Sequence, residues 1–215
     1  MKTQTQGSYC SVTRSLEVVG ERWSLLVVRD LLPGSQRFSD LLSAVAGITP
    51  KLLTLRLRDL EANGVVHRDE EAGRRDVWYS LTESGLALRP VIRELVIWGI
   101  YHGQPPQSGE TARSRRGATS CVAVFNREGL TPSKPLTWAI DFGDGSPSPF
   151  RFDGRDWDLA PDASPADVEL VISSTPKALI GLFRTPRGER AELARSIDVQ
   201  GSEEQIENFR GLFAA

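Results

Sequence analysis

The stretch from Ile48 to Gly64, ITPKLLTLRLRDLEANG, places the strongest constraint on how this chain folds. Thr49 and Pro50 predict a helix start, because threonine caps free N–H groups and proline suits the first helical position. Gly64 marks the end of the helix. Leucines at helical spacing predict a buried side, and the opposite side is short-chained at first and basic further along. The buried side holds Leu53, Leu57 and Leu60, and the outer side holds Lys51, Thr54, Leu55, Arg58 and Ala62.

A helix of this kind fits a DNA major groove, although an ordinary amphipathic surface helix has the same pattern. The residues before it favour the first interpretation. Ser39 begins another short helix that stops at Gly47, and a tight turn then leads into the Pro50 helix. Two short helices joined in this way are typical of a helix-turn-helix. The expected DNA contacts of this part are Arg37, Ser39, Thr49, Pro50, Lys51, Thr54, Leu55 and Arg58.

Two strand-like runs follow directly after this helix. They cover residues 65–68 and 77–81 and enclose a charged, glycine-containing loop at 69–76. A hairpin in this position is expected to form a wing, with Arg74 and Arg75 near its tip reaching a minor groove or its phosphates. An exposed hairpin with solvated charges is the alternative when the hairpin is considered alone.

A long helix is expected from Leu86 to about Tyr101, with Pro90 either in its first turn or at a kink. Its apolar stripe is broader than one small domain needs. It therefore predicts a dimer helix, which would pair with the first helix at 11–19. A dimer places two recognition helices about one DNA turn apart and implies a near-palindromic operator in double-stranded DNA.

Charge is unevenly distributed along the 215 residues. The formal net charge is −2, and Lys and Arg counted against Asp and Glu give +1 for residues 1–103 and −5 for residues 119–215. DNA binding therefore requires positive charge focused on one surface, with the acidic half turned away from the phosphates. No apolar run approaches a membrane span of roughly 18 residues and no export leader is visible, so we expect a cytoplasmic protein with no membrane partner.

The chain lacks the residue patterns of metal and catalytic sites. Its cysteines and histidines are Cys10, Cys121, His67 and His102, and none stands at ligand spacing from another. The phosphate loop, the dinucleotide-binding glycine motif and the calcium loop are all missing from the sequence. We therefore expect no metal, no cofactor and no enzymatic activity.

Residues 10–99 resemble the HxlR family of bacterial winged-helix transcription regulators, which are relatives of the MarR regulators. The resemblance is carried by LEVVGERW at 16–23, LLPG at 31–34, RFSDL at 37–41, GITPKLLT at 47–54, RLRDLE at 56–61, GVV at 64–66, YSLTESG at 79–85 and WG at 98–99. It implies a homodimeric DNA-binding regulator, with a DNA-binding and dimerisation domain over 1–103. Leu55 stands where the family often has a polar residue, so base preference is not transferable from relatives.

Cys10 has two interpretations that the residues leave open. In some members of this family the cysteine at this position senses oxidants or electrophiles, and the adjacent helix start and Arg14 would favour its thiolate. The alternative is a small apolar residue that packs in the dimer. Cys121 lies in the other domain and is expected to be structural.

The second half begins with a linker at 104–118, rich in Pro, Gly, Ser, Gln and Arg. Residues 119–215 then predict a strand meander, a helix, a strand and a final helix. Their pattern resembles the sterol-carrier-protein fold, notably DVELVI at 167–172, STP at 174–176, SIDV at 196–199 and GS at 201–202. That resemblance implies an apolar cavity for a hydrophobic small molecule. Its expected lining residues, for each of which plain core is the alternative, are Trp138, Phe142, Phe152, Trp157, Leu179 and Phe183.

The predicted fold class is α+β. It joins an N-terminal winged helix-turn-helix, mainly α with a β-hairpin wing, to a C-terminal α+β domain like the sterol carrier proteins. The predicted function is that of a homodimeric, sequence-specific DNA-binding transcriptional regulator, a repressor whose second domain binds an apolar effector. Two alternatives stay open: a redox-sensing regulator that acts through Cys10, with a structural second domain, and a hydrophobic-ligand carrier whose winged helix only dimerises.

Overall fold

The computed structural model of the chain describes residues 9–70, 77–107 and 110–214. It consists of two compact units, Met1–Arg89 and Pro90–Ala215, and each is described by itself. This boundary lies well before the expected one at residue 103, because Ile97 and Ile100 are buried in the core of the second unit. Within the described ranges, no helix is long and apolar enough to cross a membrane.

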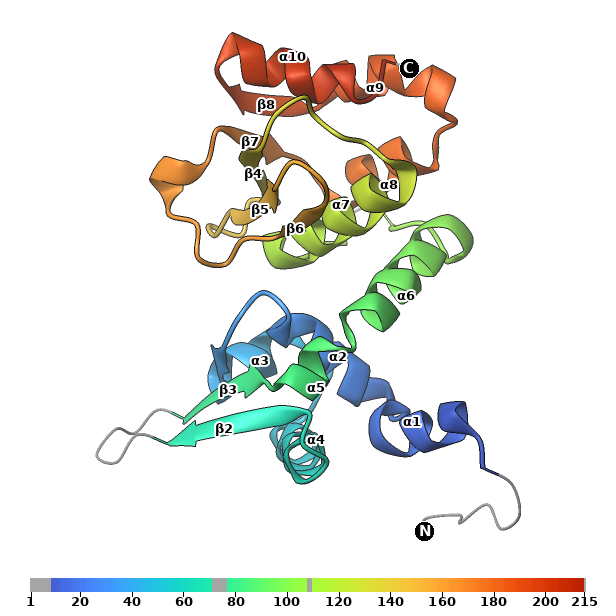
Figure 1. Ribbon diagram of the computed structural model, residues 1–215, viewed down its shortest axis with the longest axis vertical. Coiled ribbons are helices and arrows are strands. Elements are labelled where there is room, and N and C mark those ends of the chain that lie inside the picture. The colour runs from blue at the N-terminus through green and yellow to red at the C-terminus, as the bar shows by residue number, and fades with distance from the viewer. Residues whose placement is uncertain (1–8, 71–76, 108–109, 215) are drawn as a thin grey trace. The chain divides into compact units, whose positions relative to one another are not determined.

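The first unit combines short helices with a small antiparallel sheet, as Figure 1 shows. The strand order is β1-β3-β2, so β3 lies in the middle and β2 forms the outer strand of the hairpin. The elements are α1 (Ser11–Val19), α2 (Arg22–Leu31), β1 (Gln36–Arg37), α3 (Phe38–Ala44), α4 (Pro50–Ala62), β2 (Val66–Glu70), β3 (Val77–Leu81) and α5 (Glu83–Leu86).

The core of the first unit decides which side of α4 faces outward. Leu53, Leu57 and Leu60 are at most 2% exposed, and α4 packs against α2, where Val27 and Val28 are fully buried. Burying one such side chain contributes roughly 1.5–3 kcal/mol, so rotation of α4 about its axis would be costly. The expected helix-turn-helix with a β-hairpin is confirmed, and the outer side of α4 is the predicted one.

The second unit is a mixed sheet with helices. Its strand order is β6-β5-β4-β7-β8, in which β4 and β7 are parallel and the other neighbours are antiparallel. The elements are α6 (Arg89–His102), α7 (Ser114–Glu128), β4 (Leu136–Asp141), β5 (Ser148–Phe152), β6 (Trp157–Leu159), β7 (Leu170–Ser173), α8 (Pro176–Arg184), α9 (Arg190–Ser196), β8 (Asp198–Gly201) and α10 (Glu203–Gly211).

The starts of two helices differ from the predicted ones. The helix expected from Leu86 begins later, since α5 ends at Leu86 and α6 starts at Arg89, and Pro90 lies in its first turn, which is one of its two expected positions. The expected linker at 104–118 is not wholly a linker, since α7 begins at Ser114. Gly117 serves close packing here: a Cβ at this position would lie 2.8 Å from the Phe142 ring.

A hydrogen-bond network fixes the start of α7. The Asp144 carboxylate accepts hydrogen bonds from the Ser114 backbone N–H at 3.0 Å and from its hydroxyl at 2.6 Å. The Ser114 hydroxyl oxygen accepts the Phe142 N–H at 2.9 Å. The polar residues of the supposed linker therefore tie the helix to the loop that follows β4.

Aromatic rings fill the interior of the second unit. Trp157 lies 5.2 Å from both Phe125 and Trp138, measured between ring centroids, and it contacts two further phenylalanines. Buried indole N–H groups need acceptors, and the Trp157 Nε1 donates to the Leu130 carbonyl at 2.7 Å. These contacts form a packed core in which Trp138 and Phe152, two of the residues expected to line a cavity, pack against a third, Trp157.

Candidate nucleic-acid interface

A tight turn joins α3 to α4. Gly47 adopts a φ of +83° in this turn, a conformation that side chains with a Cβ rarely reach. Thr49 then caps α4, because its Oγ1 accepts the Leu52 backbone N–H at 3.3 Å. Pro50 occupies the first turn, where its missing N–H costs nothing. The predicted start of α4 is confirmed.

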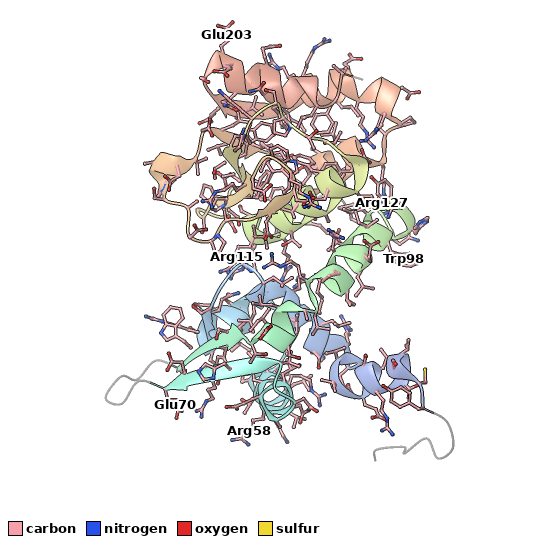
Figure 2. All side chains as sticks on the ribbon, in the orientation of Figure 1. Arg58, Glu70, Trp98, Arg115, Arg127 and Glu203 are labelled. Atoms are coloured by element: carbon pink, nitrogen blue, oxygen red, sulfur yellow. The ribbon has the colours of Figure 1, made fainter. Side chains whose placement is uncertain are left out.

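A strip of exposed side chains runs along the outer side of α4. Lys51, Leu55 and Arg58 recur at helical spacing and all three are exposed, Leu55 by 47%. Figure 2 shows Arg58 projecting from the outer side of α4. Thr54 lies at the edge of the strip, half-buried, and its hydroxyl donates to the Pro50 carbonyl at 2.9 Å. We call Lys51, Thr54, Leu55 and Arg58 the α4 strip.

Arg56 shows that not every arginine of α4 faces outward. Its side chain is 14% exposed and lies 3.3 Å from the Asp59 carboxylate and 3.9 Å from the Glu21 carboxylate. Glu21 precedes the first turn of α2, so the pair ties α4 to α2. Arg56 is therefore an anchor of the helix, whereas Lys51 and Arg58 extend into solvent.

The start of α3 and the hairpin supply further cations. Arg37 is exposed, and its guanidinium lies 4.9 Å from the centroid of the Trp78 ring, a cation–π distance. Ser39 is exposed in the first turn of α3. Arg74 and Arg75, the predicted wing-tip contacts, lie outside the described residues.

One polar pocket of this face contains residues that the sequence interpretation missed. It has a volume of about 120 Å³ and lies between α4 and the hairpin. Arg68 and Tyr79 are opposite each other in the β2–β3 register. The alternation of side chains along the two predicted strands would have indicated that they lie on the same face of the hairpin. The pocket is lined by Thr54, Leu57, Arg58, Glu61, Arg68 and Tyr79.

Neighbouring groups orient the guanidinium of Arg68. A hydrogen bond to the Tyr79 hydroxyl is the main cause that raises the pKa of Arg68 above its ordinary value, and the nearby charge of Glu70 adds to it against the opposing effect of burial. Arg68 also forms an ion pair with Glu70. The cation therefore stays charged and is directed along the hairpin next to Arg58.

Cys10 is exposed at the start of α1. The Thr13 hydroxyl and the backbone N–H groups of Thr13 and Val12 hydrogen-bond its sulfur and lower the pKa of the thiol. The expected help from Arg14 is absent, because the Arg14 guanidinium pairs with Glu17 at 3.0 Å. Cys121 is fully buried, and burial raises the pKa of its thiol, which leaves it in the inert protonated form.

The six expected ligand-lining residues lie together, in the core of the second unit. All except Phe142, which is half-buried, are at most 3% exposed. A groove of the same unit runs between α8 and α9 and is lined by none of the six. The difference arises because aromatic rings fill the core, whereas α8 and α9 leave space between them.

Comparison with known proteins covers the first half of the chain. The profile described as HxlR-like helix-turn-helix matches residues 18–107. The HTH-type transcriptional regulator YdeP of Bacillus subtilis is 38% identical over 105 residues, which span 48% of this chain and 82% of that protein. A second HTH-type transcriptional regulator of that species, YybR, is 37% identical over 91 residues, which span 42% of this chain and 73% of YybR.

Among solved structures, the redox regulator HypR in its reduced form is 36% identical. The alignment covers 42% of this chain and 90% of the HypR chain, with a TM-score of 0.40. The profile match ends at residue 107, so the likeness of the second unit to sterol carrier proteins stays a prediction. On the match of its first half and its identity with YdeP, the chain belongs to the HxlR-like helix-turn-helix family of transcriptional regulators.

Proposed function

We propose that this protein is a homodimeric, sequence-specific DNA-binding repressor whose second unit is an effector module. The observation that carries the DNA-binding part is the α4 strip. A helix that enters a major groove needs cations for phosphates and base edges, and an apolar group for thymine methyls. Lys51, Arg58 and Leu55 supply these three kinds of contact from one exposed side of α4.

The remaining predicted residues take supporting roles in the proposed complex. Thr49, Pro50 and Thr54 bring the start of α4 close to the bases, because their side chains are short. Arg37 and Ser39 contact the phosphates from the start of α3. Arg74 and Arg75 hold the wing on the DNA backbone, and this part of the proposal rests on the sequence alone.

Exposed apolar side chains on two helices support the dimer. On α6, Val91, Leu95 and Trp98 are between 45% and 62% exposed and recur at helical spacing, and we call them the α6 stripe. On α1, Val12 and Leu16 are exposed by 66% and 56%. Exposed apolar stripes of this kind mark protein–protein interfaces, so we assign both helices to the contact between two copies.

The test begins with selection of DNA ligands for the full-length protein from a random pool. Fluorescence anisotropy then measures the affinity of Lys51→Ala and Arg58→Ala for the selected site at matched salt. Because base contacts are worth about 1–3 kcal/mol each, each variant should lose roughly 5- to 150-fold in affinity for each half-site that the dimer occupies. Loss of a base contact should also relax the sequence preference at that position.

Arg155→Ala is the matched control, because the Arg155 side chain is 90% exposed and lies in the second unit. It removes the same kind of charge and should leave affinity unchanged. Wild-type binding by both α4 variants would refute the assignment of α4. The same result would favour the alternative of a hydrophobic-ligand carrier whose winged helix only dimerises. The exposed Lys51 and Arg58 are evidence against that alternative, because dimerisation needs neither of them.

A redox-sensing regulator is a second candidate, and the environment of Cys10 favours it. The thiol is exposed and hydrogen bonds from Thr13 lower its pKa, which increases the reactive thiolate fraction. If Cys10 is the sensor, an oxidant should change operator affinity in the wild type and not in Cys10→Ser. An identical oxidant response in the two proteins would exclude this role.

A further inference from the structure

The groove between α8 and α9 has no role in the expected function. α8 and α9 are neighbours in the second unit (Figure 1), and the groove between them has a volume of about 380 Å³. Sites that hold small organic molecules span roughly 300–1,000 Å³. The residues that line this α8–α9 groove are Thr175, Lys177, Ala178, Gly181, Leu182, Thr185, Leu193, Ser196 and Ile197.

The lining is apolar apart from hydroxyl groups and one charge. Leu182 and Ile197 are buried beneath the groove, and Leu193 is 41% exposed at its side, so the surface suits a hydrocarbon chain. Lys177 is the charged residue among those that line it. A cation beside an apolar surface is complementary to a molecule with one negative end.

The hydroxyl groups of the groove indicate which negatively charged group the ligand carries. Thr175 accepts the Ala178 N–H at 3.2 Å, which leaves its own O–H as a donor. Thr185 and Ser196 already donate to backbone carbonyls, at 2.9 Å and 2.7 Å respectively. The Lys177 ammonium has three N–H donors, more than one partner uses, and Thr175 adds its O–H from a neighbouring position. This set matches a carboxylate, an acceptor with two oxygens.

We propose that the α8–α9 groove binds a small amphipathic carboxylate, of the kind of a medium-chain fatty acid, and that its occupancy acts on α6. The binding step concerns the second unit alone. The action on α6 rests on the proposed function, because α6 carries the stripe assigned to the dimer.

Both walls of the groove are attached to the C-terminal end of α6. From α8, Arg184 Nη2 donates to the Gly103 carbonyl at 2.6 Å, and its Nε donates to the Ile100 carbonyl. From α9, Arg190 donates to the Glu128 carboxylate, which in turn accepts the Tyr101 hydroxyl. A ligand that binds more tightly at one spacing of α8 and α9 therefore favours that spacing, and the hydrogen bonds that hold the C-terminal end of α6 change with it.

Calorimetric titration of the full-length protein with octanoate and decanoate tests the binding step. Gly181→Leu should weaken binding at least about ten-fold by filling the groove, since a Cβ at Gly181 meets no atom within 4 Å. Gly211→Leu is the matched control, because Gly211 lies in α10 with equally free space and outside the groove. No saturable binding by the wild type, or equal binding by Gly181→Leu, would overturn the site.

The charge has its own variant. Lys177→Gln should lower the affinity for decanoate about two- to five-fold, as expected for an ion pair in contact with solvent, and leave that for 1-decanol unchanged. Equal effects on the two ligands would overturn the carboxylate assignment.

The action on α6 is measured as the ratio of operator affinities with and without saturating decanoate. This ratio should differ from one by about five-fold or more in the wild type and return to one in Arg184→Gln, which should still bind decanoate. A ratio of one in the wild type, or an unchanged ratio in Arg184→Gln, would overturn the coupling. Operator binding without decanoate tests the proposed function separately, so the two failures are distinguishable.

Discussion

Two neighbours, Tyr79 and Glu70, orient the guanidinium of Arg68 next to Arg58. A DNA phosphate that contacts Arg58 from this side therefore lies within reach of Arg68. Arg68→Ala should weaken operator binding and reduce the magnitude of the log–log salt slope by about one for each protomer. Fluorescence anisotropy over a salt series measures both quantities.

The control for Arg68 is its own neighbour. Tyr79→Phe keeps the buried ring and removes only the hydroxyl, so the charge remains and the salt slope should stay as in the wild type. A wild-type slope in Arg68→Ala would remove the residue from the interface.

Glu128 provides a test by pH in the second unit. Burial opposes its ionisation, but hydrogen bonds from Arg190 and Tyr101 outweigh burial and lower the pKa of Glu128. The unfolded chain then takes up a proton at higher pH than the folded chain. Stability contributed by Glu128 is therefore present above its ordinary pKa and is lost as the pH falls through the folded value.

We expect the free energy of unfolding of the second unit to fall as the pH is lowered through the ordinary pKa of a glutamate and below it, as measured by urea denaturation. Glu128→Gln should be less stable at neutral pH, because Arg190 loses its charged partner, but should lose less stability on acidification. An equal pH dependence of the two proteins would show that other carboxylates dominate. Tyr101 adds a spectroscopic marker, since burial, together with its bond to Glu128, raises the pKa of its phenol to about 12.

At the scale of elements, α6 has a different surface on each side. Its inner residues Ile97 and Ile100 are buried, whereas the α6 stripe is exposed, with Trp98 labelled in Figure 2. Arg93 lies about 200° around the helix from Val91, on the side away from the stripe. These two surfaces let one helix belong to the second unit and still contact another copy.

Leu95→Glu should weaken the dimer by about 100-fold or more, because each protomer would bury an unpaired charge in the contact. Sedimentation equilibrium over a concentration series measures the dissociation constant. Arg93→Glu adds the same side chain opposite the stripe and should leave the dimer intact. A Leu95→Glu protein as dimeric as the wild type would place the contact elsewhere.

The helices around α7 show where sequence patterns stop predicting elements. Residues 114–118 look like linker because they are glycine- and arginine-containing and lack a strong apolar period. Gly117 is small because β4 and the Phe142 ring approach it closely, and this contact is invisible without the sheet. The short helix α9 was also missed, since its burial depends on Arg190, which bonds to the Thr185 and Phe183 carbonyls.

For the whole molecule, the position of the boundary between the units has measurable consequences. A fragment of residues 90–215 retains α6, whereas one of residues 104–215 loses Ile97, Ile100 and the carbonyls that Arg184 binds. The longer fragment should be more stable by at least about 3 kcal/mol, since two buried isoleucines are involved. Urea denaturation of the two fragments measures the difference.

The longer fragment carries Leu95→Glu in this comparison, so that association through the α6 stripe does not contribute. Equal stability of the two fragments would show that the second unit begins after residue 103, as the sequence predicts. A less stable 104–215 fragment supports a second unit that includes α6.

Local pattern by itself determined α4 and its outer side. Thr49 and Pro50 set its start, and the leucine spacing set its buried side, because both depend on residues within a few turns of each other. The hairpin after α4 followed from strand alternation and a charged loop in the same way. These local features were enough to predict a winged helix-turn-helix.

Only the tertiary structure decided how α6, α7 and the aromatic residues are used. The apolar period of α6 is the same whether its inner side meets one unit or the other, and burial of Ile97 and Ile100 assigns it to the second. Trp138 and Trp157 suit a core as well as a cavity, and contacts with residues far along the chain make them core. The physical reason is that burial depends on partners distant in sequence, which periodicity within one segment does not record.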